Sequence, residues 1–313
     1  MLRVAYLGPP GTFTEEALRT QPDLAAQELA PTRSVPDVLA TVERGDADLG
    51  LVPLENSIEG SVAITLDTLA FDTDLLIQRE VDLAISLRLC ARPGVTLPDV
   101  RAVRSHPHAY AQCRGWLGRK LPHVAVEAAN STSEAALQVS RSRRTDQAAV
   151  CTALAARLYG LEVLATEIED HPENQTRFVL VGRGIPTPTG HDKTSIVCFQ
   201  REDRPGSLLA ILSEFAARSI NLTKLESRPT KRALGDYCFF IDCEGHVADE
   251  PVADVLKHLA ARQAEVKFLG SYPVAGEEEA RARRRVASRR WKAASAWIDE
   301  IRASIRAGDD LGS

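Results

Sequence analysis

The first half of the chain alternates between short apolar segments and polar loops. Five segments have the length and composition of buried strands, at residues 2–7, 47–52, 100–103, 124–127 and 148–151. Several of the loops that follow these segments carry residues typical of the start of a helix. Thr12 stands three residues before Glu15 in a capping-box pattern, Pro107 suits a first helical position, and Thr152 precedes a helix closed by Gly160. This strand–loop–helix order predicts an α/β fold with mainly parallel sheets.

Two further apolar segments, at residues 78–89 and 161–168, predict crossings between two lobes. Lobe 1 would comprise about residues 1–78 and 165–182, and lobe 2 about residues 79–164. The crossings would bring Thr176 into lobe 1 beside Thr12 and Asn56. Ligands of such folds bind beyond the carboxyl ends of strands, where helix N-termini attract anions. Because the loops there carry hydroxyl and amide side chains, we expect a cleft that binds a small ligand with several negative charges.

The stretch Asn174-Gln175-Thr176-Arg177-Phe178 stands at the mouth of a predicted buried strand, residues 179–181. Its hydroxyl and guanidinium groups are adjacent in the sequence, and both can donate hydrogen bonds to an anion or to a departing oxygen. The alternative is a threonine at a strand edge and a solvated arginine. The other loops of the domain favour a functional pair.

The second half of the chain begins after a linker rich in Gly, Pro and Thr, residues 182–190. Strands are predicted at residues 193–200, 221–227, 236–243 and 265–272, and helices at 206–218 and 252–262. This βαββαβ order is typical of a small ferredoxin-like domain, residues 193–273.

Residues 274–313 form a predicted charged helical tail. Seven Arg or Lys residues lie between Arg281 and Lys292, and an apolar stripe recurs at spacings of three and four. The members of the stripe are Trp291, Ala294, Ile298, Ile301 and Ile305. This pattern favours a surface helix that docks on its own chain or on a partner subunit. An RNA-seeking or membrane-seeking tail is the alternative.

Composition narrows the class of protein. The 313 residues are 44% hydrophobic and 26% charged, which is ordinary for a soluble globular protein of two or three domains. The formal net charge of -5 argues against a general nucleic-acid binder, and no apolar run approaches the length that spans a membrane. The N-terminal segment lacks the pattern of a signal peptide, so a cytoplasmic protein is expected.

Neither the cysteines nor the histidines are spaced in the sequence like the ligands of a metal site. The six cysteines form no C-x-x-C pair, and the seven histidines no H-E-x-x-H pattern. We therefore expect reduced, buried cysteines and chemistry that needs neither a metal nor a cofactor. The cysteines are Cys90, Cys113, Cys151, Cys198, Cys238 and Cys243.

Taken in order along the chain, the motifs resemble a known family. Residues 1–182 resemble the prephenate dehydratase domain, and residues 193–273 resemble an ACT regulatory domain. In the first domain the matching stretches are Gly8-Pro9-Pro10-Gly11-Thr12-Phe13-Thr14, Val52-Pro53-Leu54-Glu55-Asn56-Ser57-Ile58-Glu59-Gly60, Ser105-His106-Pro107, Ala111-Gln112-Cys113, Ser131-Thr132, Tyr159-Gly160-Leu161 and Asn174-Gln175-Thr176-Arg177-Phe178. In the second they are Gly206-Ser207-Leu208, Asn221-Leu222-Thr223 and Glu226-Ser227-Arg228-Pro229.

The resemblance implies a two-lobed, periplasmic-binding-protein-like catalytic domain that converts prephenate to phenylpyruvate without a cofactor. Thr176 would donate a hydrogen bond or proton to the departing hydroxyl, and Arg177 would bind a carboxylate or hold its loop. Glu55 would be an acid–base group or a structural carboxylate. Asn56, Ser57 and Thr12 would be donors in lobe 1, and Ser105, His106, Ser131 and Thr132 would face them from lobe 2. His106 is equally a candidate helix cap, and Phe13 and Phe178 are candidates for packing or substrate contact.

For the second domain the resemblance implies a phenylalanine site at an interface between subunits, and hence a homodimer or homotetramer. The implied effector-binding residues are Gly206, Ser207, Leu208, Asn221, Leu222, Glu226 and Ser227. The chain departs from the family pattern at two positions. Ser207 replaces a common alanine, and His108 stands where glutamine usually follows Ser-His-Pro.

Two alternative functions remain at this point. The first is an arogenate dehydratase, whose substrate has an amino group where prephenate has a keto group. The second is a non-catalytic two-lobed module that senses an amino acid, because such modules share this architecture. The adjacent Thr176 and Arg177 argue against a purely sensory role.

Overall fold

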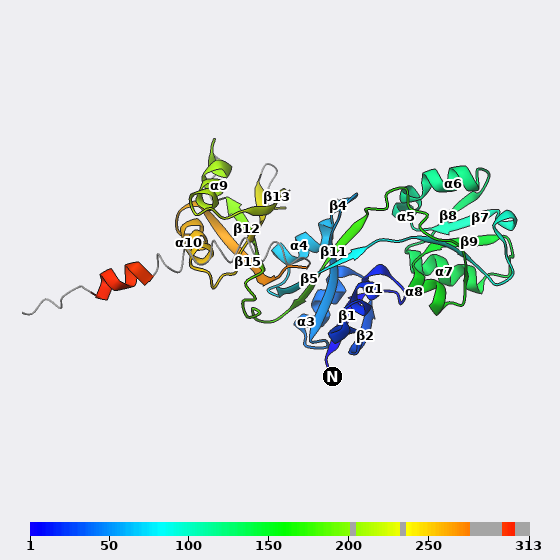
Figure 1. The fold of residues 1–313 in the computed structure, drawn as a ribbon, viewed down its shortest axis with the longest axis horizontal. Helices are drawn as coiled ribbons and strands as arrows, with labels where there is room; N and C mark the ends of the chain where they lie inside the picture. Colours follow the sequence, from blue (N-terminus) through cyan, green and yellow to red (C-terminus); the bar gives the residue numbers. More distant parts are fainter. Residues whose placement is uncertain (201–204, 232–235, 276–295, 304–313) are drawn as a thin grey trace, which may run out of the picture. The chain divides into compact units, whose positions relative to one another are not determined.

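The computed structural model of the protein describes residues 1–200, 205–231, 236–275 and 296–303 (Figure 1). The chain divides into two compact units, Met1–Gly184 and Ile185–Ser313. The first unit contains two sheets, and the second contains one. Across the described residues, no helix combines the length and the apolar character that crossing a membrane requires.

The first sheet of the first unit has the strand order β2-β1-β3-β11-β5, with the short β4 paired to β3. Its strands are β1 (Arg3–Leu7), β2 (Glu28–Thr32), β3 (Leu49–Asn56), β4 (Gly60–Ser61), β5 (Leu76–Ala84) and β11 (Gln175–Gly182). Its helices are α1 (Phe13–Arg19), α2 (Pro22–Ala25), α3 (Val35–Glu43) and α4 (Ala63–Phe71). β1 runs parallel to β2 and β3, whereas β11 is antiparallel to both β3 and β5. We call these elements the first lobe.

The second sheet has the strand order β10-β6-β9-β7-β8. Its strands are β6 (Arg88–Ala91), β7 (Ala102–Ser105), β8 (Ala125–Ala128), β9 (Gln147–Cys151) and β10 (Glu162–Ala165). Its helices are α5 (Pro107–Gln112), α6 (Arg114–Lys120), α7 (Thr132–Arg141) and α8 (Ala153–Leu158), with a short 3₁₀ turn at Leu97–Asp99. β7 is parallel to β8 and β9, so the carboxyl ends of these three strands lie at one edge. We call these elements the second lobe.

The chain crosses between the lobes later than the hydrophobic pattern predicts. β5 stays in the first sheet up to Ala84, so the first crossing is residues 85–87 and not residue 79 onward. The return crossing is residues 166–174, because β10 pairs with β6 of the second sheet. The crossings are bonded to each other: Ile85 N donates to Asn174 O at 2.8 Å, and Ile168 N donates to Leu87 O at 3.2 Å.

The single helix predicted from Pro107 through Trp116 is two helices, because a side chain caps the second. Asp170 accepts hydrogen bonds from Gly115 N at 2.7 Å and from Trp116 N at 2.9 Å. These are unpaired N–H groups of the first turn of α6, so the new helix begins there. A Cβ at Gly115 would lie 2.7 Å from the Asp170 carboxylate, which explains the glycine.

The helix predicted to start after Thr12 is present, but the capping box predicted between Thr12 and Glu15 does not form. Thr12 is the N-cap of α1, but its hydroxyl donates to Leu7 O at 3.0 Å and makes no cap hydrogen bond. The Glu15 carboxylate instead accepts from Gly11 N at 2.7 Å, and it also receives Arg19 at 2.6 Å. Glu15 is 4% exposed, so these donors compensate a buried charge.

The second unit has the βαββαβ order that the sequence predicts. Its elements are β12 (Asp192–Gln200), α9 (Ser207–Ala217), β13 (Leu222–Pro229), β14 (Tyr237–Glu244), α10 (Glu250–His258), a turn of π-helix (Leu259–Gln263) and β15 (Ala264–Pro273). The sheet order is β13-β14-β12-β15 and all its pairs are antiparallel, as in a ferredoxin-like fold. Ile196, Phe215, Ile241 and Val255 lie in its core. The α/β fold predicted for both domains is confirmed. The mainly parallel sheets predicted for the first domain are wrong, because the strands next to the crossings, β5, β6 and β11, pair antiparallel with their neighbours and make both sheets mixed.

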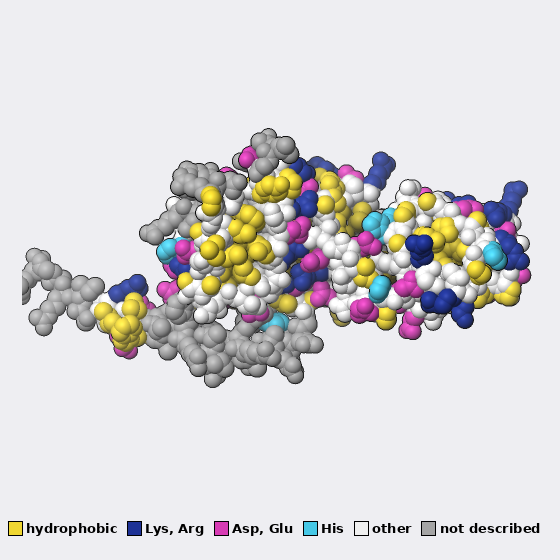
Figure 2. Space-filling model, turned by 90° about the horizontal axis from the view of Figure 1, so that it is seen from above, with side chains coloured by type: hydrophobic (Ala, Val, Ile, Leu, Met, Phe, Trp, Pro, Cys, Tyr) yellow, Lys and Arg dark blue, Asp and Glu magenta, His cyan; other side chains and the backbone are white. Residues whose placement is uncertain are grey.

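Much of the predicted tail lies outside the described residues, including Trp291, Ala294 and Ile305. Residues 296–303 are helical. Trp297 is 59% exposed and Ile298 is 38% exposed on this helix. Figure 2 shows hydrophobic side chains at the surface of this helix. The docking of the tail therefore stays a prediction.

All six cysteine side chains are buried and none forms a disulfide. Burial raises the pKa of Cys198 and of Cys243 to about 12 each, because the thiolate loses its hydration. The hydrogen bond with Cys151 lowers the pKa of Cys90, but this thiol is buried like the other five. Because a reagent must reach the thiolate to react with it, the native protein should resist a thiol reagent. We expect a disulfide-exchange reagent at pH 8 to label no cysteine rapidly in the native chain and all six after unfolding in urea. Rapid labelling of the folded protein would contradict this burial.

Candidate active site

Strand pairing places Asn56 directly opposite Thr176. The two residues are register partners at the ends of β3 and β11. Asn56 Nδ2 donates to Thr176 Oγ1 at 2.9 Å. The orientation of the amide follows from its other end, because Asn56 Oδ1 accepts from Ile58 N and Glu59 N at 3.0 Å each. The Thr176 oxygen is therefore an acceptor toward Asn56, and its own proton is free to be donated elsewhere.

Ser57 joins the same two strand ends, but its polar groups are used within the protein. Its N–H donates to Gln175 O at 2.9 Å, and its Oγ accepts from Gln175 N at 3.0 Å. Its hydroxyl donates to Asn174 Oδ1 at 3.4 Å. The geometry thus favours a supporting position for Ser57 over a free donor to a ligand.

Asn174 and Gln112 belong to this cluster although the sequence analysis did not select them as site residues. Asn174 Oδ1 accepts from Asn56 Nδ2 at 2.8 Å, and Asn174 Nδ2 donates to Gln112 Oε1 at 3.2 Å. Gln112 is the last residue of α5 in the second lobe. A signal was available for Asn174, because it stands two residues before Thr176 in the same motif, directly before β11 begins at Gln175.

Arg177 lies on the opposite face of β11 from Thr176, as the alternation of a strand requires. Its Nε lies 2.6 Å from Glu80 and its Nη1 lies 3.2 Å from Glu55. The Glu80 side chain is only 1% exposed, so it depends on this partner for charge compensation. The arrangement favours the loop-holding role for Arg177 and the structural role for Glu55.

The predicted second-lobe residues follow the carboxyl ends of β7 and β8. Ser105 is 1% exposed and its hydroxyl donates to His106 O at 3.0 Å. His106 is the N-cap of α5 but makes no side-chain cap bond. Its ring stacks on His108 with 5.3 Å between centroids, and burial, reinforced by His108, lowers the pKa of His106. His106 is therefore held mainly neutral. His108 Nδ1 lies 3.2 Å from Glu59, a contact that joins the lobes.

Four other predicted site residues have structural partners. Ser131 caps α7 by accepting from Glu134 N at 2.9 Å, and Thr132 is the first residue of that helix, 8% exposed. Phe178 lies in the first lobe's core, whereas Phe13 packs against the cores of both lobes. Within the described part of the chain, no hydrogen bond joins these residues or Thr12 to Thr176, so their role toward substrate stays a prediction.

The loop between β1 and α1 is bonded to the second lobe. Pro10 O accepts from Ser133 Oγ and from Tyr159 Oη, the latter at 2.9 Å. Gly11 O accepts from Thr152 Oγ1 at 2.8 Å. Gly11 has a φ of 89°, and a Cβ there would lie 2.8 Å from Ser133 Oγ, so only glycine fits. The sequence patterns did not indicate Ser133, Thr152 or Tyr159 as site residues.

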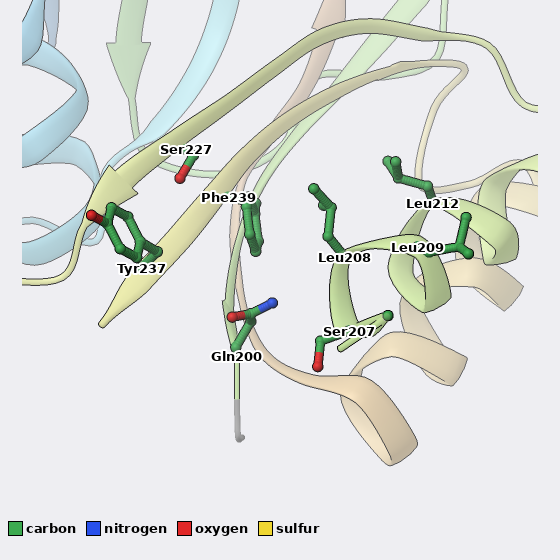
Figure 3. A pocket seen from close by; sticks show the side chains of 9 residues that line it. Gln200, Ser207, Leu208, Leu209, Leu212, Ser227, Tyr237 and Phe239 are labelled. Atoms are coloured by element: carbon green, nitrogen blue, oxygen red, sulfur yellow. The ribbon is translucent and has the colours of Figure 1, made fainter. Parts of the chain in front are cut away.

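The second unit contains a pocket of about 480 Å³ between α9 and the sheet (Figure 3). Leu208 of α9 lies opposite Phe239 of β14, with Gln200 and Ser207 beside them. The full lining is Gln200, Gly206, Ser207, Leu208, Leu209, Leu212, Ser227, Tyr237 and Phe239. An apolar wall with a few polar groups suits a small aromatic ligand.

The predicted effector residues divide into two sets. Gly206, Ser207, Leu208 and Ser227 line the pocket, whereas Asn221, Leu222 and Glu226 do not. Glu226 and Ser227 are consecutive in β13 and therefore point to opposite faces of the sheet. Glu226 lies 3.2 Å from Lys224 and 3.3 Å from Arg228, which share its face.

The comparisons with known proteins agree with this architecture. Residues 4–185 match the family described as Prephenate dehydratase, which covers more than half of the chain. The chain belongs to the prephenate dehydratase family. Residues 194–261 match the ACT domain. Among the described residues, no group of three or more His, Cys, Asp or Glu side chains is placed to hold a metal ion.

Relatives and solved structures extend the match over most of the chain. The prephenate dehydratase of Mycolicibacterium vanbaalenii is 48% identical over 285 residues, covering 86% of this chain and 90% of the relative. The structure of prephenate dehydratase from Arthrobacter aurescens in complex with L-Phe has a TM-score of 0.85 at 40% identity, covering 97% of this chain and 100% of that one. GqqA, described as a novel type of quorum quenching acylase, has a TM-score of 0.77 at 30% identity, covering 87% and 98%.

The contacts of Arg177 distinguish a structural role from substrate binding. Replacing Arg177 by Met leaves the buried Glu80 carboxylate without this partner, and we expect the free energy of unfolding to fall by roughly 3 kcal/mol. Adding Glu80→Gln to that variant should recover part of the loss, because it removes the uncompensated charge. Urea unfolding of the full chain measures both. Wild-type stability together with a large rise in KM would instead identify Arg177 as a substrate ligand.

Proposed function

We propose that the chain is a carbon–oxygen lyase that converts prephenate to phenylpyruvate, with loss of water and carbon dioxide. The observation that carries this proposal is the hydrogen bond from Asn56 to Thr176 Oγ1. It makes the threonine hydroxyl an oriented donor at the end of β11. An oriented donor is what a departing hydroxide requires, because a hydrogen bond that strengthens as charge develops lowers the barrier.

The reaction needs little more than this donor and a site that holds the substrate. The carbon–carbon bond to the ring carboxylate breaks and releases carbon dioxide. Its electron pair completes the aromatic ring as the ring carbon–oxygen bond breaks on the other side. The departing hydroxide takes up a proton and leaves as water. Threonine is a very weak acid, so a strengthening hydrogen bond from Thr176 is favoured over complete proton transfer.

The same bond argues against an acylase mechanism for Thr176. A nucleophilic threonine needs a neighbouring base that takes its proton. The Asn56 amide is oriented with its Nδ2 toward Thr176, so it donates and cannot accept. We therefore favour elimination over acyl transfer. A module that only senses an amino acid would not need a hydroxyl oriented in this way.

Arogenate remains the alternative substrate, because it differs from prephenate only at the side-chain keto group. Comparison of kcat/KM for the two substrates decides between them. The cytoplasmic location and the homodimeric or homotetrameric state also remain predictions.

The second unit adds a proposed regulatory site. We propose that L-phenylalanine, the product formed from phenylpyruvate by transamination, binds the pocket of Figure 3 and inhibits turnover. The apolar side chains of Leu208, Leu212 and Phe239 suit its ring. Backbone N–H groups near Gly206 would meet its carboxylate, and a second subunit would complete the site.

Replacement of Thr176 tests the proposed reaction. Thr176→Val keeps the shape of the side chain and removes the donor, so we expect kcat to fall by about 10²–10³-fold while KM changes much less. Thr176→Ser keeps the hydroxyl and should retain most of the rate. Phenylpyruvate formation from prephenate, without added metal, is the measurement. Near-normal turnover by the valine variant would remove Thr176 from the mechanism.

Filling the pocket tests the regulatory site. Ser227→Trp places an indole in the space proposed for the ring of phenylalanine. We expect added L-phenylalanine to leave the turnover of this variant unchanged, whereas the wild-type protein is inhibited. Ser213→Trp is the matched control, because Ser213 is exposed on α9 and does not line the pocket. Inhibition that persists in Ser227→Trp would place the effector elsewhere.

A further inference from the structure

We propose that Asn174 is the positioning residue that aligns the Thr176 hydroxyl and makes this alignment depend on contact between the two lobes. The proposal rests on the dehydratase reaction described above and adds a residue that the sequence did not select. Asn174 does not touch Thr176. It acts through Asn56, whose Nδ2 is bonded to both residues.

The backbone of Asn174 is fixed where the chain returns from the second lobe. Its carbonyl accepts from Ile85 N of the other crossing at 2.8 Å, and its N–H donates to His171 O at 3.1 Å. The residue is 0% exposed. A buried amide at a junction of two crossings must have its polar atoms satisfied within the protein, and here they are.

The two ends of the amide face different lobes. Oδ1 accepts from Asn56 at 2.8 Å and from Ser57 at 3.4 Å, both at the end of β3. Nδ2 donates to Gln112 at 3.2 Å on α5 of the second lobe. Only a side chain with an acceptor and a donor at this spacing joins the lobes in this way. A shift of α5 would therefore move the Asn174 side chain and, through its bond to Asn56, the Asn56 amide as well.

The Asn56 amide has two hydrogens and three neighbouring acceptors. They are Asn174 Oδ1 at 2.8 Å, Thr176 Oγ1 at 2.9 Å and Gln175 O at 3.2 Å. Asn174 holds one hydrogen, which leaves the other directed at Thr176. Ile58 N and Glu59 N hold the Oδ1 end in any case, but loss of the Asn174 acceptor would let Nδ2 shift toward Gln175 O. The bond to Thr176 would loosen, and the threonine would no longer be constrained to point its proton at the substrate.

Asn174→Asp is the sharpest test, because it keeps the shape and the acceptor and replaces the donor by a charge. Above neutral pH the ionised carboxylate opposes the negative charge that develops on the departing hydroxide. We expect kcat to fall by at least about 100-fold with KM within about threefold of wild type. As the pH falls the carboxyl becomes protonated and regains a donor, so kcat should recover relative to wild type.

Gln175→Glu is the matched control, since it makes the same amide-to-acid change one residue away on an exposed side chain. Gln175 takes part in the cluster through its backbone N–H and carbonyl, which the substitution keeps. Other titratable groups near the crossing are His171, Glu173, Glu169 and Asp170, with Glu59 and His106 on the adjoining loops. They are shared by both variants and by the wild type. The control should therefore keep the wild-type kcat and pH profile, and a new titration should appear only in Asn174→Asp.

A second pair of variants covers the case in which Asn174→Asp folds poorly. Gln112→Met removes the acceptor on α5 and should lower kcat with little change in KM. Combining it with Asn174→Ala should cost no more than Asn174→Ala alone, because both break one chain of hydrogen bonds. Additive losses, or lower stability at unchanged kcat, would assign Asn174 a structural role only and overturn the proposal.

The outcomes separate this inference from the proposed function. Wild-type turnover that Asn174→Asp leaves unchanged would overturn the role of Asn174 and leave the dehydratase activity standing. Failure of the wild-type protein to form phenylpyruvate would overturn both.

Discussion

The hydrogen bond between the Asn56 amide and the Thr176 hydroxyl is the interaction on which the proposed chemistry depends. It exists because β11 returns from the second lobe and inserts between β3 and β5, antiparallel to both. The chain thereby brings residues 120 positions apart into register. A hydroxyl that already accepts one bond has its proton committed to another direction, and this converts an ordinary threonine into an aimed donor.

The two lobes are held together by contacts of several kinds around their junction. Two carbonyl oxygens of the Gly8–Thr12 loop accept hydrogen bonds from hydroxyls of the second lobe. His108 contacts Glu59, and Asn174 donates to Gln112. Phe13 adds an apolar contact that both cores share. These contacts lie in loops and at the ends of helices, beyond the ends of the strands. The site is thus built from short polar segments placed by two independent sheets.

Arg177 shows that two residues adjacent in the sequence need not belong to the same site. The neighbouring hydroxyl and guanidinium suggested a joint site, but a strand sends consecutive side chains to opposite faces. Thr176 therefore joins Asn56, and Arg177 joins Glu55 and the buried Glu80. The same alternation separates Glu226 from Ser227 in β13, so only Ser227 reaches the pocket of the second unit. In both cases the period of two was available from the sequence and decided the outcome.

The sequence by itself predicted the α/β class, most of the strands of the first domain and the βαββαβ order of the second, but not β2 or α3. These predictions follow from local patterns, turn residues and hydrophobic periodicity, whereas the expected place of Thr176 beside Asn56 depended on two predicted crossings between lobes. Only the tertiary structure decided the bonding of Glu15, the break before α6, and the placement of Asn174 against Gln112. Each of these depends on side chains from separate segments meeting at fixed distances. Asn174 and Gln112 lie 62 positions apart and on either side of a crossing, so their contact arises only when both lobes are folded and packed.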